Sequence, residues 1–133
     1  MGRAHEDYWY YVRRVLYDYP RLAQEERELK TISATPAYGA MGHGAGPGDP
    51  TALLATRELP RNKQRRLEAV QQAIRETERR PNGTHRLRVV ELVYFKRSHT
   101  LQGAALMVPC SYRTAKRWHR DFICQVARNL DLP

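Results

Sequence analysis

The sequence predicts an all-α protein, in which an N-terminal helical arm and a long central helix precede a C-terminal helix-turn-helix. Three observations support this fold class. Apolar residues recur at three- and four-residue steps along most of the chain, which is the period of a helix with one buried face. Glycine and proline separate these stretches. No candidate strand has a second strand with which it could pair. The length of 133 residues suits one domain that carries an arm.

Residues 1–32 form the predicted N-terminal arm. Its first helix, over residues 5–19, carries an apolar and aromatic stripe. The stripe consists of Tyr8, Tyr11, Val12, Val15, Leu16 and Tyr19. Pro20 is expected to break or kink the helix, because proline lacks an amide proton and its ring clashes with the preceding turn. A second helical piece with an acidic outer face follows. We expect the aromatic side chains to pack against another helix or a second subunit.

Residues 33–50 form a predicted linker, because five glycines and three prolines in SATPAYGAMGHGAGPGDP cannot sustain a helix or a strand. No strand precedes these glycines, which argues against a phosphate-binding loop. Residues 51–80 follow as a unit, with a short helix at 51–59 and a long helix at 61–80. The long helix has a narrow apolar seam, formed by Leu67, Val70, Ala73 and Ile74. Such a seam suits packing against one other helix, and with the tyrosine-rich first helix it is our candidate for oligomerisation.

Residues 81–133 form the predicted DNA-binding domain. Pro81, Asn82 and Gly83 end the long helix, and Thr84 can cap the next one. The helix expected at 85–96 is apolar on more than one side, so it should be a buried strut. A strand over residues 88–95 is the competing interpretation, because this stretch is rich in β-branched residues.

A helix-turn-helix is predicted from Thr100 to Asn129. The first helix runs to about Val108, with two small residues, Ala104 and Ala105, where the helices would cross. Pro109 interrupts it, and Ser111 is placed to cap a second helix over residues 111–129. The second helix has one apolar face. This face consists of Ala115, Trp118, Phe122, Ile123, Val126 and Leu130.

The opposite face of the second helix is cationic, which favours binding to double-stranded DNA. The candidate DNA-binding residues are Ser111, Tyr112, Arg113, Thr114, Lys116, Arg117 and Arg120. Arg113 and Arg117 are expected to read base edges, because guanidinium can donate two hydrogen bonds to guanine. Tyr112, Lys116 and Arg120 are expected to contact phosphates, and Thr114 and the backbone at the helix start are further candidates for such contacts. The alternative is a basic helical hairpin that binds no nucleic acid.

The charge distribution agrees with a C-terminal DNA-binding unit. The net charge is +9. Residues 1–50 carry six Lys or Arg against seven Asp or Glu, whereas residues 81–133 carry nine against three. We expect no membrane span, no secretion signal and a cytoplasmic location. No residue pattern indicates a catalytic site, a metal site or a cofactor, and Cys110 and Cys124 are expected to be reduced thiols.

The C-terminal unit resembles region 4 of bacterial sigma factors. The matching pieces are VVELVYF at 89–95, TLQGAA at 100–105 and SYRTAKRWHRDF at 111–122. This resemblance implies a recognition helix that begins at Ser111, and contact with the host RNA polymerase.

A resemblance that covers most of the chain is to the RinA/ArpU family of phage late-gene transcriptional regulators. The matching pieces, in the family's order, are YDYPRL at 17–22, GAMGHGAG at 39–46, NKQRRLEAV at 62–70, YFK at 94–96 and SYRTAKRW at 111–118. This chain has Ala115 where the family often has an aromatic residue. The resemblance implies a phage or prophage activator of late genes, such as those for packaging.

Two further expectations concern the oligomeric state and the alternative functions. One recognition helix reads few base pairs, so we expect a homo-oligomer, most simply a dimer. A phage small terminase subunit, which also binds DNA through a helix-turn-helix, is the alternative function. Small terminases more often place that unit first in the chain, whereas here it comes last. A module that binds only proteins is a further alternative.

Overall fold

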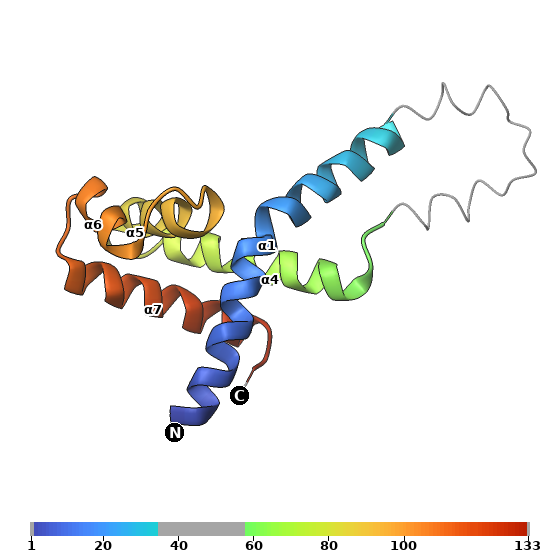
Figure 1. Cartoon of the computed structure of the whole chain (residues 1–133). Coiled ribbons are helices and arrows are strands. Elements are labelled where there is room, and N and C mark those ends of the chain that lie inside the picture. The colour runs from blue at the N-terminus through green and yellow to red at the C-terminus, as the bar shows by residue number, and fades with distance from the viewer. Residues whose placement is uncertain (1, 35–57, 133) are drawn as a thin grey trace, which may run out of the picture.

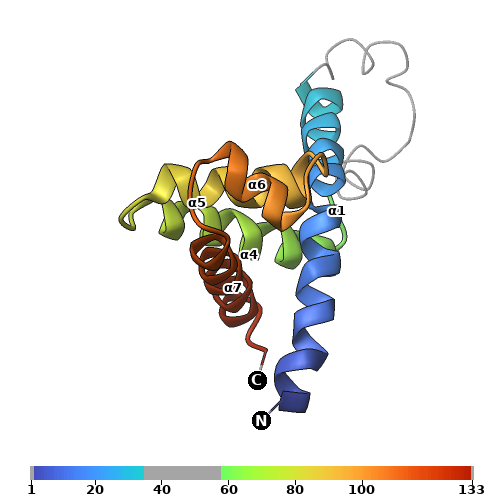
Figure 2. The same cartoon turned by 60° about the vertical axis from the view of Figure 1, so that its left-hand side comes forward.

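The computed structural model describes residues 2–34 and 58–132, and the protein is all-α, as the sequence predicts. No β-strand occurs within these two ranges. Figures 1 and 2 show the long N-terminal helix lying across a group formed by the other helices. The elements, in chain order, are α1 (Gly2–Ala34), α4 (Arg61–Glu78), α5 (Gly83–Val90), η1 (Glu91–Phe95), α6 (Leu101–Met107) and α7 (Tyr112–Asn129).

Helix α1 continues through Pro20. A break at this residue is therefore wrong, whereas a bend is visible near the middle of the helix (Figure 1). Proline removes one backbone hydrogen bond from a helix. Leu16 before it and Leu22 after it are both buried. Tertiary packing thus holds the two halves of α1 in one helix.

Two predicted segments fall mostly outside the described residues. The first two residues of the linker predicted at 33–50 belong to α1. The rest of the linker, and residues 51–57 of the predicted short helix, lie outside the described ranges. Glu58 and Leu59, at the end of that predicted helix, are not helical. Leu59 is buried in a small cluster with Leu22 and Leu67.

The first half of α1 is part of the protein's main core, not a separate arm. The main core is a buried cluster formed by α1, α4, the α5–η1 segment and α7. Its members are Val12, Val15, Leu16, Ala69, Val70, Ala73, Val90, Tyr94, Phe122, Ile123, Val126, Ala127 and Leu130. Among the aromatic side chains of α1, four pack against it: Tyr8, Trp9, Tyr17 and Tyr19. The predicted units 1–32, 51–80 and 81–133 therefore share one core.

Helix α4 buries the narrow seam that the sequence predicts. Leu67, Val70 and Ala73 are at most 1% exposed, and Ile74 packs against the main core. The Asn129 side-chain amide of α7 donates a hydrogen bond to the carbonyl of α4 residue 69 at 3.0 Å. Helices of the same chain fill this seam. The expectation that it joins two subunits is therefore wrong.

The α5–η1 segment lies between two buried clusters, as expected of a strut. Val90 and Tyr94 belong to the main core. The second cluster, here called the turn cluster, consists of Val89, Leu92, Ala104, Val108 and Trp118. The segment ends in one turn of π-helix, where the Lys96 amide donates to the Glu91 carbonyl at 2.8 Å. The strand proposed at 88–95 is wrong, because the segment is helical up to Phe95.

Helix α5 begins one residue before the predicted threonine cap. It starts at Gly83 and follows Asn82, whose φ of 61° places it in the left-handed region. Thr84 lies inside the first turn, so the prediction that it caps the helix is wrong. A β-carbon added to Gly83 would lie 2.7 Å from the carbonyl oxygens of Thr77 and Glu78. The close approach of α4 and α5 therefore requires glycine here.

We expect Gly83→Ala to lower the free energy of unfolding by about 1–3 kcal/mol, because a methyl group would push the end of α4 away from α5. Thr84→Ala is the matched control, and should change the free energy by no more than about 0.5 kcal/mol. Urea unfolding of both variants measures the difference. A larger loss for Thr84→Ala would mean that the predicted cap matters after all.

Helices α6 and α7 are joined by the short turn that the sequence predicts. Figures 1 and 2 show α6 lying over the first turns of α7. Thr100 Oγ1 caps α6 by accepting a hydrogen bond from the Gly103 amide at 3.0 Å. Ala104 and Ala105 are buried. Small residues here allow the two helices to approach closely.

Candidate nucleic-acid interface

Helix α7 has one buried face and one exposed face, as predicted. Six residues of its apolar face are buried: Ala115, Trp118, Phe122, Ile123, Val126 and Leu130. On the opposite face Arg113, Lys116, Arg117 and Arg120 are exposed, and Tyr112 is 44% exposed. Because the apolar face packs into the main core and the turn cluster, the cationic face points outward.

Two arginines from outside α7 hold this helix against the rest of the protein. The Asp121 carboxylate forms ion pairs with Arg86 at 3.3 Å and with Arg80 at 3.7 Å. The Arg86 guanidinium also lies over the Trp118 ring, 5.6 Å from its centroid. Asp121 is the single acidic residue of α7. Its charge is therefore neutralised by arginines outside the exposed face.

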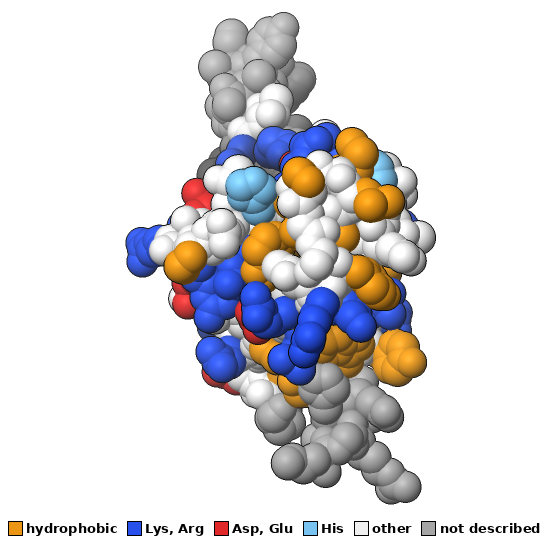
Figure 3. All heavy atoms as spheres, turned by 90° about the vertical axis from the view of Figure 1, so that its left-hand side faces the viewer, with side chains coloured by type: hydrophobic (Ala, Val, Ile, Leu, Met, Phe, Trp, Pro, Cys, Tyr) orange, Lys and Arg blue, Asp and Glu red, His pale blue; other side chains and the backbone are white. Residues whose placement is uncertain are grey.

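Four exposed cations of α7 pair with no carboxylate of the part of the chain that the structure describes. Among the described residues, Arg113, Lys116, Arg117 and Arg120 form no ion pair. Lys116 Nζ lies 4.8 Å from the centroid of the Tyr112 ring. Figure 3 shows Lys and Arg side chains gathered in a band on the face that bears α6 and the start of α7. Uncompensated positive charge on one face favours contact with a polyanion.

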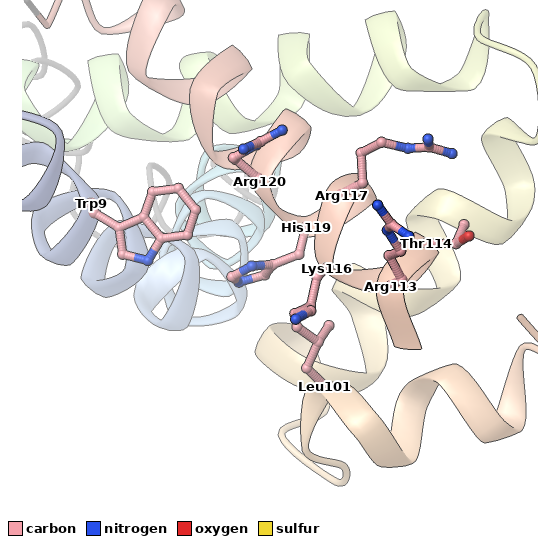
Figure 4. A pocket seen from close by; sticks show the side chains of 8 residues that line it. All are labelled: Trp9, Leu101, Arg113, Thr114, Lys116, Arg117, His119 and Arg120. Carbon is pink, nitrogen blue, oxygen red and sulfur yellow. The ribbon is translucent and has the colours of Figure 1, made fainter. Parts of the chain in front are cut away.

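An open hollow of about 590 Å³ lies along this cationic face. Three elements line it, α1, α6 and α7 (Figure 4). The lining residues are Trp9, Leu101, Arg113, Thr114, Lys116, Arg117, His119 and Arg120. Pockets of about 300–1,000 Å³ commonly bind small molecules, but these are mostly apolar. Among the residues whose side chains the structure describes, four cations and no carboxylate line this hollow, so it suits an anionic ligand.

The hollow brings together five of the seven residues predicted to contact DNA. These five are Arg113, Thr114, Lys116, Arg117 and Arg120. Ser111 caps α7 by accepting a hydrogen bond from the Thr114 amide at 3.0 Å, as predicted. Its hydroxyl also donates to Thr114 Oγ1 at 2.8 Å. Ser111 and Tyr112 do not line the hollow, and their contact with DNA stays a prediction.

Sequence reasoning missed three residues of the hollow: Trp9, Leu101 and His119. Trp9 belongs to α1, which is far from α7 in the chain. Periodicity within one helix cannot show which other helix is its neighbour. The density of aromatic residues in α1 was the one signal that could have pointed to Trp9.

His119 is held in place by a buried tyrosine. The Arg13 Nε donates a hydrogen bond to the Tyr94 hydroxyl at 3.1 Å, and this hydroxyl is hydrogen-bonded to His119 Nε2. Because the tyrosine oxygen accepts from arginine, we assign its proton to the bond with Nε2, which places the imidazole proton on Nδ1.

Burial keeps the His119 imidazole and the Tyr94 hydroxyl neutral near pH 7. Burial, with a smaller contribution from the charge of Arg13, lowers the pKa of His119 from 6.5 to about 4. Burial raises the pKa of Tyr94 to about 12. The side of the hollow formed by His119 is therefore polar and uncharged.

The described residues contain neither a metal-binding group nor a helix able to cross a membrane. No three His, Cys, Asp or Glu side chains in these ranges are grouped so as to hold a metal ion. None of the described helices combines the length and apolarity needed for a membrane span. Cys110 lies in the turn and Cys124 on α7, and both are free thiols.

No protein-family model matches this chain, and no curated protein or solved structure is similar to it. A function must therefore be inferred from the surface itself. The features that bear on it are the cationic face of α7, the hollow beside it and the buried contacts that orient the helix.

Proposed function

We propose that the protein is a sequence-specific regulator of transcription that binds double-stranded DNA through α7. The observation that carries this proposal is the row of four exposed cations on α7, Arg113, Lys116, Arg117 and Arg120, which pair with no carboxylate of the described part of the chain. The opposite face of the helix is buried, so the row is oriented before any ligand binds. The major groove, about 12 Å wide, accepts an α-helix with its side chains.

Each cation has a proposed role in this complex. Arg113 and Arg117 lie in the first two turns of α7, and would donate paired hydrogen bonds to guanine edges. Lys116 and Arg120 would contact phosphates and set the position of the helix in the groove. Tyr112 supports Lys116 through the contact between its ring and the ammonium group.

The resemblance to the RinA/ArpU family supplies the biological part of the proposal. It implies an activator of late phage genes, encoded by a phage or prophage and acting in the cytoplasm of the bacterial host. The resemblance to sigma region 4 adds the host RNA polymerase as a partner. We further propose a dimer, because one α7 contacts few base pairs. Its interface would use a surface other than the α4 seam, which is buried within the chain.

Fluorescence anisotropy tests this proposal. The ligands are a duplex from upstream of the neighbouring late genes and a scrambled duplex of the same composition, each titrated over a salt series. We expect the native duplex to bind at least about a thousandfold more tightly than the scrambled one. Equal and steeply salt-dependent binding to both would contradict sequence-specific regulation. A large ring-shaped oligomer in light scattering would instead favour a small terminase subunit.

Two substitutions separate base reading from phosphate contact. Arg113→Ala should weaken binding to the native duplex by about 1–3 kcal/mol and relax the preference for one base pair. Lys116→Ala should weaken binding to all duplexes similarly and lower the slope of log K against log salt by about one. Anisotropy with single-base-pair variants of the duplex measures both effects. An equal loss on every sequence from Arg113→Ala would refute the role assigned to this residue.

A further inference from the structure

The hollow beside α7 has two unlike sides (Figure 4). Trp9 from α1 and His119 lie on one side, and Arg113, Thr114 and Arg117 lie on the other. Lys116 lies between the two sides, above Leu101 of α6. Helix α1, which lies outside the helix-turn-helix, thus contributes to the lining of the hollow beside the cationic face.

Trp9 is held in place on its side of the hollow. Its ring meets the His119 ring edge-on, with 5.5 Å between the centroids. It is partly buried and packs against the main core. The His119 ring is in turn parallel to the ring of Tyr94, with 5.5 Å between the centroids, and is hydrogen-bonded to its hydroxyl. A ligand in the hollow would therefore meet an aromatic surface that is already in place.

The chemistry of the lining indicates the ligand. Four cations favour a ligand with more than one negative charge or a chain of such charges. Trp9 and Leu101 add an aromatic and an aliphatic surface, which a small inorganic anion would leave unused. A sugar-phosphate strand offers both complements, because its phosphates are anionic and its deoxyriboses present apolar edges.

We infer that one sugar-phosphate strand of the bound duplex runs through this hollow, with one phosphate held by Arg120, a neighbouring phosphate held by Lys116, and a deoxyribose against Trp9. This inference rests on the proposed DNA binding and deepens it. It makes α1 a part of the DNA interface in addition to α6 and α7.

The chain's two tryptophans allow a direct test. Trp118 is 7% exposed and lies in the turn cluster. In Trp118→Phe, Trp9 is the single remaining tryptophan. We expect saturating native duplex to change its emission and to lower its acrylamide quenching constant about threefold or more, because the strand would cover the indole. In Trp9→Phe, the emission of buried Trp118 should not change. Inorganic phosphate at the same phosphate concentration should leave Trp9 unchanged.

Duplexes in which single phosphates are replaced by uncharged groups test where the strand runs. Replacing one duplex phosphate at a time by an uncharged methylphosphonate should reveal a position that costs about tenfold in affinity with the unsubstituted protein. In Arg120→Gln, the same replacement should cost nothing further, because the contact is already lost. If the losses of affinity from the methylphosphonate and from Arg120→Gln add fully at every phosphate position, Arg120 does not hold a phosphate.

The outcomes separate this inference from the proposed function. Sequence-specific binding with unchanged quenching of Trp9 would overturn the inference and leave the proposed function standing. Absence of duplex binding by the unsubstituted protein would overturn the proposed function itself. Protection of Trp9 by inorganic phosphate alone would overturn the inference in favour of a small-anion site. If Trp118→Phe does not fold, the difference in tryptophan emission between the unsubstituted protein and Trp9→Phe gives the signal of Trp9.

Discussion

A fragment of residues 81–133, the predicted DNA-binding domain, should lose cooperative thermal unfolding. Its Tyr94, Ile123 and Val126 are buried in the main core. That core also needs residues of α1 and α4, which the fragment lacks. Removing these helices would expose the apolar faces of both α7 and the strut. A domain as short as this fragment is marginally stable even when its core is complete. Circular dichroism during heating measures the loss.

A milder change in the full chain tests the same packing. Leu16→Ala should cost about 2–5 kcal/mol, because Leu16 is fully buried and the cavity cannot collapse completely. Arg14→Ala, at an exposed position on the same helix, should stay within about 0.5 kcal/mol. A cooperative fragment 81–133, or an equal effect of the two substitutions, would show that α1 is a dispensable arm.

Acid should destabilise the protein through His119. Its pKa is about 4 in the folded protein and 6.5 in an unfolded chain. Between these values the unfolded chain binds more protons, so stability falls as the pH falls from 6.5 toward 4. The full difference between the two pKa values corresponds to about 3 kcal/mol in the free energy of unfolding. Above pH 6.5 this contribution is fully present. Urea unfolding at pH 7, 5.5 and 4.5 measures the slope.

Two histidine variants provide the controls for this pH dependence. His119→Gln removes the titrating group, and should give a less stable protein with a flatter pH profile over this range. His85→Gln, at an exposed position, should keep the slope of the unsubstituted protein. If His119→Gln retains the full slope, the acid sensitivity originates elsewhere.

The cationic face of α7 was predicted closely, whereas the hollow beside it was not predicted. The serine cap, the buried side and the exposed arginines of α7 all follow from spacing within a single helix. Five of the predicted residues line the hollow, because they share one face of that helix. The contribution of Trp9 could not be predicted in this way, because it depends on how α1 crosses α7.

The errors in the fold have the same origin. Pro20 was expected to interrupt α1, since proline disfavours helix when neighbouring residues alone are considered. Burial of Leu16 and Leu22 stabilises the helix on both sides of it. The α4 seam suited an interface with another helix, and sequence could not tell whether that helix belonged to the same chain. Gly83 was expected only to help end the long helix, whereas its essential property is that it allows two backbone segments to approach closely.

The sequence by itself determined the helical class, the capped turn and the division of α7 into an apolar and a cationic face. Caps and faces depend on residues no more than a few positions apart, so a local pattern is sufficient to encode them. Only the tertiary structure decided that α1 joins the main core and that Trp9 and His119 border the cationic hollow. These features depend on contacts between helices distant in the chain, and the shape of the whole core selects which helices meet.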